Sequence, residues 1–501
     1  MNITFLPKFR QVSINEPENL MKIMRQHRIT MDFVCGGHGT CGKCKVLVTK
    51  GNQSSFSNSE MALLSEEERA KGYRLACDFL VQEDTCIIVE EREEAEQITE
   101  QAPKVFGKIQ VAFDIGTTTI EAAFLENRTE MITKKIRVNP QRSYGLDVMS
   151  RLTYAVQDRE HARLLSKVIL AALNEMIQDF LKEYQVDNDQ IEKMIVMGNT
   201  AMIHLLLGHP VEKLVTPPFH IDLKAFTAQA VQYGFCVSEQ CILMVPPFIG
   251  GYVGSDTLGC ILATKLWKRP GNRAIMDIGT NGELVISKDG VLSVCSTAAG
   301  PAFEGAAIVQ GMCAQKGAIY RVDRTGEDSW KVYTVDDVPA KGICGSGLID
   351  AISVLAMCGQ IDKTGHMKQK RTVLDQEGKV SLYQEDIRQF QLAKSAIRAG
   401  LEVLLHEVGV KAYELDEIII TGAFGSGVNL EHGKMCGLFP DASADSFTCI
   451  GNGSLQGGIL LLQDEQLIEE SIAIADGANH VELANNEYFR GLFLKYMDVY
   501  N

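Results

Sequence analysis

Apolar runs of strand length precede the same four residues, Asp-Ile-Gly-Thr, at two places in the chain, 114–117 and 277–280. A second apolar run follows each turn, over 120–125 in the first copy and 284–286 in the second. Strand, short polar turn and strand is the pattern of a β-hairpin. The sequence therefore predicts the same hairpin twice, and each time the first strand delivers a carboxylate to the turn.

Asp-Gly-Thr turns are common in hairpins, so one copy alone would indicate no function. Two copies behind buried strands favour a binding role. Glycine lets a ligand approach the backbone closely, the amides and hydroxyls that follow can donate to phosphate oxygens, and an Asp can hold Mg²⁺ directly or through water. The residues predicted to grip a polyphosphate from its two sides are Asp114, Gly116, Thr117, Thr118 and Thr119 in one turn and Asp277, Gly279, Thr280, Asn281 and Gly282 in the other.

A third apolar run, 418–420, also leads into a Gly-rich turn, where a nucleotide base and ribose can lie against backbone. The predicted contacts there are Gly422, Ala423, Phe424 and Gly425. Glu304 is a further candidate, because it is a carboxylate in an otherwise small and apolar loop. It can position water or contact a metal, or it can cap a helix. The sequence contains neither a P-loop motif nor a strand-linked G-x-G-x-x-G, so nucleotide binding depends on these separate turns.

These turns resemble the phosphate-1, phosphate-2 and adenosine motifs of the superfamily of acetate and sugar kinases, heat-shock chaperones and actin. The resemblance implies a two-lobed α/β ribonuclease-H-like ATPase domain with ATP in the cleft between its lobes. Asp114 and Asp277 would then orient Mg²⁺ and water rather than act as covalent nucleophiles, and Glu304 would be the third catalytic candidate.

The N-terminal part begins with two short predicted strands, at 3–6 and 11–14, and a helix over 17–26. A Gly-rich loop then carries Cys35, Cys41 and Cys44 with the spacing C-x₅-C-x₂-C, and Cys77 follows later. A [2Fe–2S] cluster needs thiolates from one wrapped loop and one from elsewhere in the fold. The spacing therefore predicts a cluster held by Cys35, Cys41, Cys44 and Cys77.

A zinc knuckle or unrelated buried cysteines are the alternatives. Zinc sites usually pair one C-x₂-C with another close pair, whereas here the fourth cysteine stands alone. The loop resembles that of β-grasp ferredoxins, with one more residue in the first gap than the plant-type spacing. The resemblance implies an α+β β-grasp fold for residues 1–90.

An acidic passage of low hydrophobicity, 91–104, separates this module from the ATP-type domain, 105–501, and is expected to be a linker. The chain has 501 residues and a formal charge of −15, which argues against a nucleic-acid partner. Its richest apolar run is too short and too interrupted by Pro and Gly to span a bilayer, so we expect no membrane association and a cytoplasmic location.

The ferredoxin-like loop is followed by an ordered set of motifs. These are Asp-Ile-Gly-Thr-Thr-Thr at 114–119, Asn-Pro-Gln at 139–141, Gly-Asn-Thr at 198–200, Gly-Tyr-Val-Gly at 251–254, Asp-Ile-Gly-Thr-Asn-Gly-Glu at 277–283, Gly-Pro-Ala-Phe-Glu-Gly at 300–305 and Gly-Ala-Phe-Gly at 422–425. Together they resemble the ATP-dependent reductive activators of corrinoid proteins. The resemblance implies one-electron reduction of a Co(II) corrinoid to Co(I), for a corrinoid protein of a methyltransferase or O-demethylase system.

Two alternatives remain open from the sequence. One is an activator of another low-potential or radical enzyme, although such activators bridge a [4Fe–4S] cluster between subunits and this chain has its own four cysteines. The other is a small-molecule kinase with a redox-sensing ferredoxin domain. The corrinoid partner, the methyl donor, the electron donor and the oligomeric state, including a homodimer, stay undetermined.

Overall fold

The computed structural model describes residues 1–6, 10–27, 29, 31, 37, 39, 42, 44–51, 55–89, 105–216, 219, 221–422 and 427–500. Within these ranges the strands form a five-stranded sheet near the N-terminus and two six-stranded sheets in the rest of the chain, together with smaller sheets. The predicted linker, 91–104, lies outside the described residues, as do Cys35, Cys41, Ala423, Phe424 and Gly425.

The N-terminal sheet has the order β2-β1-β7-β4-β5, with β1 and β7 parallel and the other neighbours antiparallel. Its strands are β1 (Asn2–Leu6), β2 (Arg10–Ser13), β4 (Lys45–Lys50), β5 (Tyr73–Leu75) and β7 (Thr85–Ile88). Helix α1 (Leu20–Gln26) buries Leu20, Ile23 and Met24 in the same core as Ile3 and Phe5. The predicted β-grasp ferredoxin fold is confirmed.

Short elements complete this part of the chain. Strands β3 (Glu18–Asn19) and β6 (Leu80–Val81) pair with each other, and helices α2 (Asn58–Leu63) and α3 (Glu66–Lys71) lie between β4 and β5. Both helices begin with a capping box, in which a Ser accepts from a backbone amide and a Glu three residues later reaches back. The local sequence therefore sets where both helices start.

The first lobe of the remaining chain contains a sheet in the order β10-β9-β8-β11-β13-β12. Its strands are β8 (Ile109–Ile115), β9 (Thr119–Glu126), β10 (Glu130–Val138), β11 (Ile191–Gly198), β12 (Phe226–Gln229) and β13 (Ile242–Val245). Helices α4 (Val148–Gln157), α5 (Arg159–Tyr184) and α6 (Thr200–Leu207) share one hydrophobic core with it. The predicted first hairpin is β8 and β9, and β11 runs parallel to β8 on the other side.

The second lobe repeats this arrangement with the order β24-β16-β15-β14-β22-β23. Its strands are β14 (Asn272–Ile278), β15 (Gly282–Lys288), β16 (Val291–Thr297), β22 (Glu417–Gly422), β23 (Phe447–Cys449) and β24 (Asn479–His480). The second hairpin, β14 and β15, again has a parallel neighbour, β22. The repeated order of hairpin and parallel strand confirms the two-lobed α/β fold.

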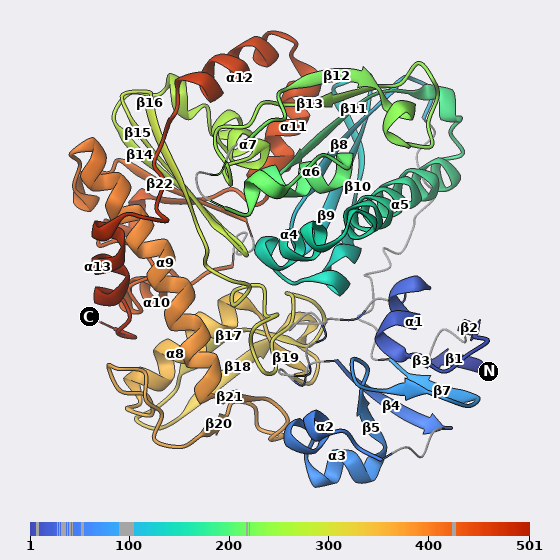
Figure 1. Ribbon diagram of the computed structural model, residues 1–501. Helices are drawn as coiled ribbons and strands as arrows, with labels where there is room; N and C mark the ends of the chain where they lie inside the picture. The colour runs from blue at the N-terminus through green and yellow to red at the C-terminus, as the bar shows by residue number, and fades with distance from the viewer. Residues whose placement is uncertain are drawn as a thin grey trace.

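Other elements of the second lobe surround this sheet. The helices are α8 (Gly345–Met357), α9 (Gln384–Val408), α10 (Leu430–Met435) and α13 (Glu487–Lys495). The small sheets are β18 (Trp330–Thr334), β17 (Ala318–Arg324) and β19 (Gly342–Ile343) in one, and β20 (Arg371–Val373) and β21 (Ser381–Tyr383) in the other. In Figure 1 the two small sheets lie on the side of the second lobe that is nearer to the blue N-terminal part.

Helices α7 (Ser255–Thr264) and α11 (Gly453–Gln463) pack between the two large sheets, and α12 (Gln466–Gly477) follows (Figure 1). Their apolar side chains share a core with Ala112 of the first sheet and Ile275 of the second. At the crossing of the two helices, a Cβ added to Gly457 would lie 2.3 Å from Gly259 Cα. Glycine is therefore required where these helices join the lobes.

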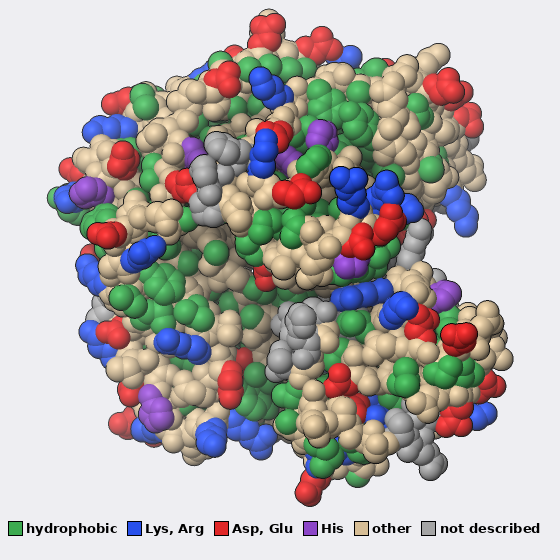
Figure 2. Space-filling model, viewed as in Figure 1, with side chains coloured by type: hydrophobic (Ala, Val, Ile, Leu, Met, Phe, Trp, Pro, Cys, Tyr) green, Lys and Arg blue, Asp and Glu red, His purple; other side chains and the backbone are tan. Residues whose placement is uncertain are grey.

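The ferredoxin part touches the first lobe through α1. Arg25 Nε donates to Ser143 O at 2.8 Å, in the 3₁₀ helix η1 (Pro140–Tyr144), and its guanidinium lies 5.0 Å from the Tyr144 ring centre. Figure 2 shows an indentation between these two parts, with acidic and basic side chains interspersed around it. Among the described residues, no helix combines the length and apolarity needed to cross a membrane.

Candidate functional site

The turns of the two hairpins face one carboxylate, that of Glu304. Thr118 Oγ1 of the first turn donates to Glu304 Oε2. From the second turn, Thr280 donates through its backbone N to Oε1 at 3.0 Å and through Oγ1 to Oε2 at 2.7 Å. The structure therefore brings together Thr118, Thr280 and Glu304, which lie far apart in the sequence.

Asp114, the carboxylate before the first turn, is tied to the second lobe. Asn452 Nδ2 donates to its Oδ2 at 2.8 Å and Ser454 Oγ to its Oδ1 at 2.6 Å, at the start of α11. Burial raises the pKa of Asp114, and these hydrogen bonds oppose that rise by favouring the charged form. Asp114 is thus a held carboxylate that links the lobes.

Asp277, the corresponding residue of the second hairpin, accepts a longer and weaker hydrogen bond from Cys260 Sγ at 3.5 Å. Burial, followed by the charge of Asp114, raises its pKa to about 7. Asp256, in the first turn of α7, faces the same space, and burial together with the charge of Asp277 raises its pKa to about 8. Asp114, Asp256 and Asp277 thus form a group of carboxylates that repel one another.

Such a group favours a cation, because a positive charge would relieve the repulsion. Oxygen ligands of this kind suit Mg²⁺. Among the described residues, however, no set of three His, Cys, Asp or Glu side chains converges closely enough to hold a metal ion alone. The donor chemistry therefore fits a Mg²⁺ whose remaining ligands come from phosphate and water.

Side chains behind the first turn hold its backbone carbonyls. Asn139 Nδ2 donates to Gly116 O at 2.8 Å, Asn139 N donates to Thr118 O at 2.9 Å, and Arg151 Nη2 donates to Thr117 O. Asn139 and Arg151 are fully buried. Because the carbonyls are occupied, the turn presents donors rather than acceptors to a phosphate.

The remaining predicted turn residues lie in the two turns or at the start of the strands that follow them. Thr119 and Gly282 begin β9 and β15, and Gly279 N donates to Asn281 O at 2.9 Å to close the second turn. A Cβ added to Gly116 would lie 2.8 Å from Thr119 O, so this tight turn requires glycine.

The predicted adenosine turn begins beside Asp277. Gly422 is opposite Ile278 in the parallel pair of β14 and β22. It has a φ of +87°, and a Cβ there would lie 2.3 Å from Asp277 Oδ1. Gly422 is therefore required both by its backbone angle and by the carboxylate. Nothing is described for the other predicted contacts, 423–425.

Two of the predicted cluster ligands are described, and they lie close together. Cys44 and Cys77 are 2% and 6% exposed. Ala76 N donates to Cys44 O at 2.8 Å, and Asn19 Nδ2 donates to Cys77 O at 2.8 Å. A Cβ on Gly37, within the predicted loop, would lie 4.0 Å from Cys77 Cβ. Sheltered thiols beside this loop suit an iron–sulfur cluster.

Sequence reasoning assigned no role to Asp256 and missed several other polar residues of the cleft. The partners of Asp114, Asn452 and Ser454, carry a local signal, because Asn452 is the N-cap of α11 and accepts from Leu455 N at 2.9 Å. That signal predicts a helix start, but it does not reveal the contact with Asp114. Arg151 gave no signal beyond its place in a helical pattern.

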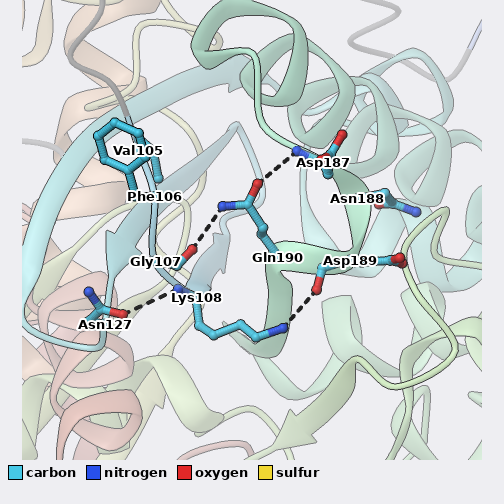
Figure 3. Close-up of a pocket in the computed structure, with 9 residues that line it drawn as sticks. All are labelled: Val105, Phe106, Gly107, Lys108, Asn127, Asp187, Asn188, Asp189 and Gln190. Atoms are coloured by element: carbon cyan, nitrogen blue, oxygen red, sulfur yellow. Dashed lines mark hydrogen bonds between the residues drawn. The ribbon is translucent and has the colours of Figure 1, made fainter.

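A separate pocket of about 800 Å³ surrounds the start of β8, at the other end of that strand from Asp114 (Figure 3). Its polar groups bond mainly to one another: Gln190 Nε2 donates to Gly107 O at 3.0 Å and Lys108 Nζ to Asp189 O at 3.1 Å. Because the polar groups that line this pocket hydrogen-bond mainly to one another, we assign the pocket no part in the site.

Family models cover almost the whole chain. The 2Fe-2S iron-sulfur cluster binding domain matches residues 3–82, the RACo middle region 109–269, and the C-terminal domain of RACo, the ASKHA domain, 272–501. The corrinoid activation enzyme RamQ of Eubacterium limosum is 31% identical over 409 residues, which cover 76% of this chain and 68% of the relative. The chain belongs to the family of reductive activators of corrinoid proteins.

Two further activator relatives are similar over most of their length. The [Co(II) methylated amine-specific corrinoid protein] reductase of Methanosarcina barkeri is 26% identical over 419 residues, covering 77% of this chain and 76% of the relative. A solved structure named reductive activator for corrinoid, iron-sulfur protein matches 99% of this chain and 98% of its own, with 27% identity and a TM-score of 0.73. The resemblance inferred from the motifs is confirmed, and the matched domains support a [2Fe–2S] cluster and ATP.

Proposed function

We propose that this activator passes one electron to the Co(II) corrinoid of a partner protein in a methyl-transfer system, restoring Co(I), with hydrolysis of ATP. The observation that carries the proposal is a ferredoxin sheet with Cys44 and Cys77 joined in one chain to a two-lobed cleft with paired Asp-Ile-Gly-Thr turns. Relatives named for corrinoid activation and for Co(II) corrinoid reduction support it.

The electron-transfer part is assigned to residues 1–90, the linker to 91–104 and the ATP-binding part to 105–501. A [2Fe–2S] cluster, which supplies one-electron transfer when bound, would be held by Cys35, Cys41, Cys44 and Cys77. Backbone hydrogen bonds fix the segments that carry Cys44 and Cys77. The chain thus contributes a buried and hydrogen-bonded setting for the thiolates of Cys44 and Cys77.

The nucleotide part is assigned to the facing turns. The hydroxyls of Thr118 and Thr280 and the amides of both turns would bind phosphate, and the 422–425 turn would receive the adenosine. Asp114 and Asp277 would orient Mg²⁺ and water, and the bound metal would neutralise phosphate charge. Asp256, whose carboxyl group interacts with that of Asp277, would contribute to the same role.

Reducing a corrinoid requires a source of driving force. Plant-type [2Fe–2S] centres have reduction potentials of about −400 mV. Moving an electron to an acceptor of lower potential costs about 2.3 kcal/mol per 100 mV of difference. A complex that favours the Co(I) state of the partner over its Co(II) state can supply several kcal/mol by differential affinity, in the way any ligand shifts an equilibrium. ATP hydrolysis would then release the partner by changing the closure of the lobes.

Two cysteine variants of the full chain test the electron path. Cys77→Ser should change the electron paramagnetic resonance signal of the reduced protein and abolish cobalt reduction, followed as Co(I) absorbance with excess corrinoid protein and Mg-ATP. Cys86→Ser is the matched control, because Cys86 lies half-buried in β7 outside the predicted ligand set, and it should behave as wild type. Cobalt reduction by Cys77→Ser at the wild-type rate would contradict the proposal.

The kinase alternative is tested separately. Incubation of the chain with ATP and candidate sugars or carboxylates should yield no phosphorylated product. Transfer of phosphate to such an acceptor, with no Co(I) formed in the first experiment, would favour a small-molecule kinase with a redox-sensing domain.

A further inference from the structure

Glu304 takes the donors that the two turns are expected to offer to a nucleotide. Its Oε2 accepts from Thr118 Oγ1 of the first lobe and, at 2.7 Å, from Thr280 Oγ1 of the second, while its Oε1 accepts from Thr280 N at 3.0 Å. Thr118 and Thr280 are 6% and 3% exposed. A carboxylate and a phosphate that share the same donors exclude each other.

Glu304 has a positively charged side chain on one side and another carboxylate on the other. Arg151, fully buried behind the first turn, contributes positive charge toward Glu304. On the other side, Glu304 and Asp277 repel each other. Adding a polyphosphate while Glu304 stays in place would therefore add negative charge to an already acidic cleft.

We propose that Glu304 is an internal stand-in for a nucleotide phosphate, which bridges the two lobes in the nucleotide-free chain and must be displaced when Mg-ATP binds. This inference rests on the proposed ATP site and deepens it. Glu304 then gates nucleotide entry as a positioning residue.

The loop that carries Glu304 can transmit the displacement. Glu304 lies between Gly300 and Gly305, which have φ values of +76° and +78°. Beyond it, Val309 N donates to Asp386 Oδ1 at 2.6 Å and Met312 N donates to Ile343 O at 2.9 Å. Displacement of Glu304 would therefore act on a segment whose far end, at Val309 and Met312, is held by α9 and β19.

The test is calorimetric titration of the full chain with a Mg-bound non-hydrolysable ATP analogue. Glu304→Gln keeps the size of the side chain but removes the charge that competes with phosphate, so it should bind about tenfold more tightly than wild type, a change of about 1.4 kcal/mol. Unchanged affinity would overturn the proposal, since the carboxylate would then not occupy the phosphate position. Weaker binding would also overturn it, because Glu304 would then be a metal contact.

Glu283→Gln is the matched control for the loss of another buried carboxyl group of the cleft, because Glu283 lies opposite Asp277 on β15 and is absent from the bridge between the turns. The gain in affinity should be clearly smaller than that of Glu304→Gln. An equal gain would overturn the bridge and indicate general charge relief.

Amide hydrogen exchange supplies a readout that does not depend on affinity. In nucleotide-free Glu304→Ala, exchange at 279–282 should be at least several-fold faster than in wild type, and the Mg-bound analogue should restore protection. Unchanged exchange would overturn the bridge. If wild type itself fails to bind the analogue, the proposed ATP site fails; if wild type binds and the variants match it, the stand-in alone fails.

Discussion

The two Asp-Ile-Gly-Thr hairpins share this motif and the pairing of its Asp with a Glu, but they differ in what their carboxylates contact. In both, the Asp lies directly opposite a Glu on the second strand, Asp114 opposite Glu121 and Asp277 opposite Glu283. Asp114 accepts from an amide and a hydroxyl of α11, whereas Asp277 accepts from the thiol of Cys260 at 3.5 Å. The repeated motif therefore fixes the position of each carboxylate, and the neighbours fix its state.

This difference gives the two carboxylates different roles. Each oxygen of Asp114 accepts one hydrogen bond from the start of α11 in the second lobe, so Asp114 is suited to report closure of the cleft. Asp277 has a weak donor, an adjacent Gly422 and a pKa raised to about 7 by burial and the charge of Asp114. It is thus the carboxylate that gains most from a metal-bound water or a cation.

The largest expected effect comes from Asp277→Asn. Phosphate release from Mg-ATP should fall at least about 100-fold, a loss typical of removing one well-placed charge-stabilising group. The cluster should remain and still accept an electron from a strong reductant, because it lies in another part of the chain. Co(I) formation with excess corrinoid protein should then stop at or below one equivalent per activator. Sustained multiple turnover would contradict the coupling of hydrolysis to release.

The next effect is on stability, and the two hairpins should differ in its sign. Asp114→Asn removes an acceptor that faces Ser454 Oγ and Asn452 Nδ2, so it should lower the free energy of unfolding by about 1–3 kcal/mol. Asp277→Asn removes a buried charge with a weak donor and acidic neighbours, so it should leave stability unchanged or raise it. Urea unfolding of the magnesium-free protein at pH 8 measures the free energy of unfolding of both variants.

A double-mutant cycle checks the cause of this difference. Ser454→Ala should destabilise the wild type but have much less effect in the Asp114→Asn background, since the hydrogen bond is already lost there. Additive effects would show that Ser454 acts independently of Asp114. Unaltered Mg-ATP affinity and hydrolysis in Asp114→Asn would in turn count against its place in the nucleotide site.

The comparison also predicts a pH dependence. The pKa of Asp277 is raised from 3.8 to about 7 in the fold, by burial and by Asp114 and Glu304, with Cys260 opposing. The folded chain therefore binds more protons than the unfolded chain between these values, and the contribution of Asp277 lowers stability as pH rises from about 4 to about 7. Unfolding of metal-free wild type and Asp277→Asn across this range should show a smaller decline for the variant. Identical slopes would place the titration elsewhere.

The sequence predicted what is local and repeated. Both hairpins and the glycines of their turns followed from patterns within short segments, and the ferredoxin fold followed from the resemblance of the cysteine loop. The hydrogen bonds of Asn452 and Ser454 to Asp114, by contrast, join residues that are 338 and 340 positions apart in the sequence. No periodicity records such a contact, because it depends on how two folded lobes pack. For the same reason Glu304 could be named as a candidate, whereas its bridge between Thr118 and Thr280 could not.

The smallest expected effect concerns the contact of the ferredoxin part with η1. This 3₁₀ helix supports the turn of the first hairpin but not that of the second. Arg25 contacts Ser143 and Tyr144, and Asn139 at the cap of the same 3₁₀ helix holds Gly116 O and Thr118 O. Arg25→Ala should therefore raise amide exchange slightly at 116–119, by a loss of about 0.5–2 kcal/mol for a partly buried cation–π contact, and leave 279–282 unchanged. Mg-ATP affinity should stay within about twofold, since Asn139 keeps its own hydrogen bonds. A larger change in affinity, or equal exchange at both turns, would show that the ferredoxin and the nucleotide cleft are coupled directly within the chain rather than through the corrinoid partner.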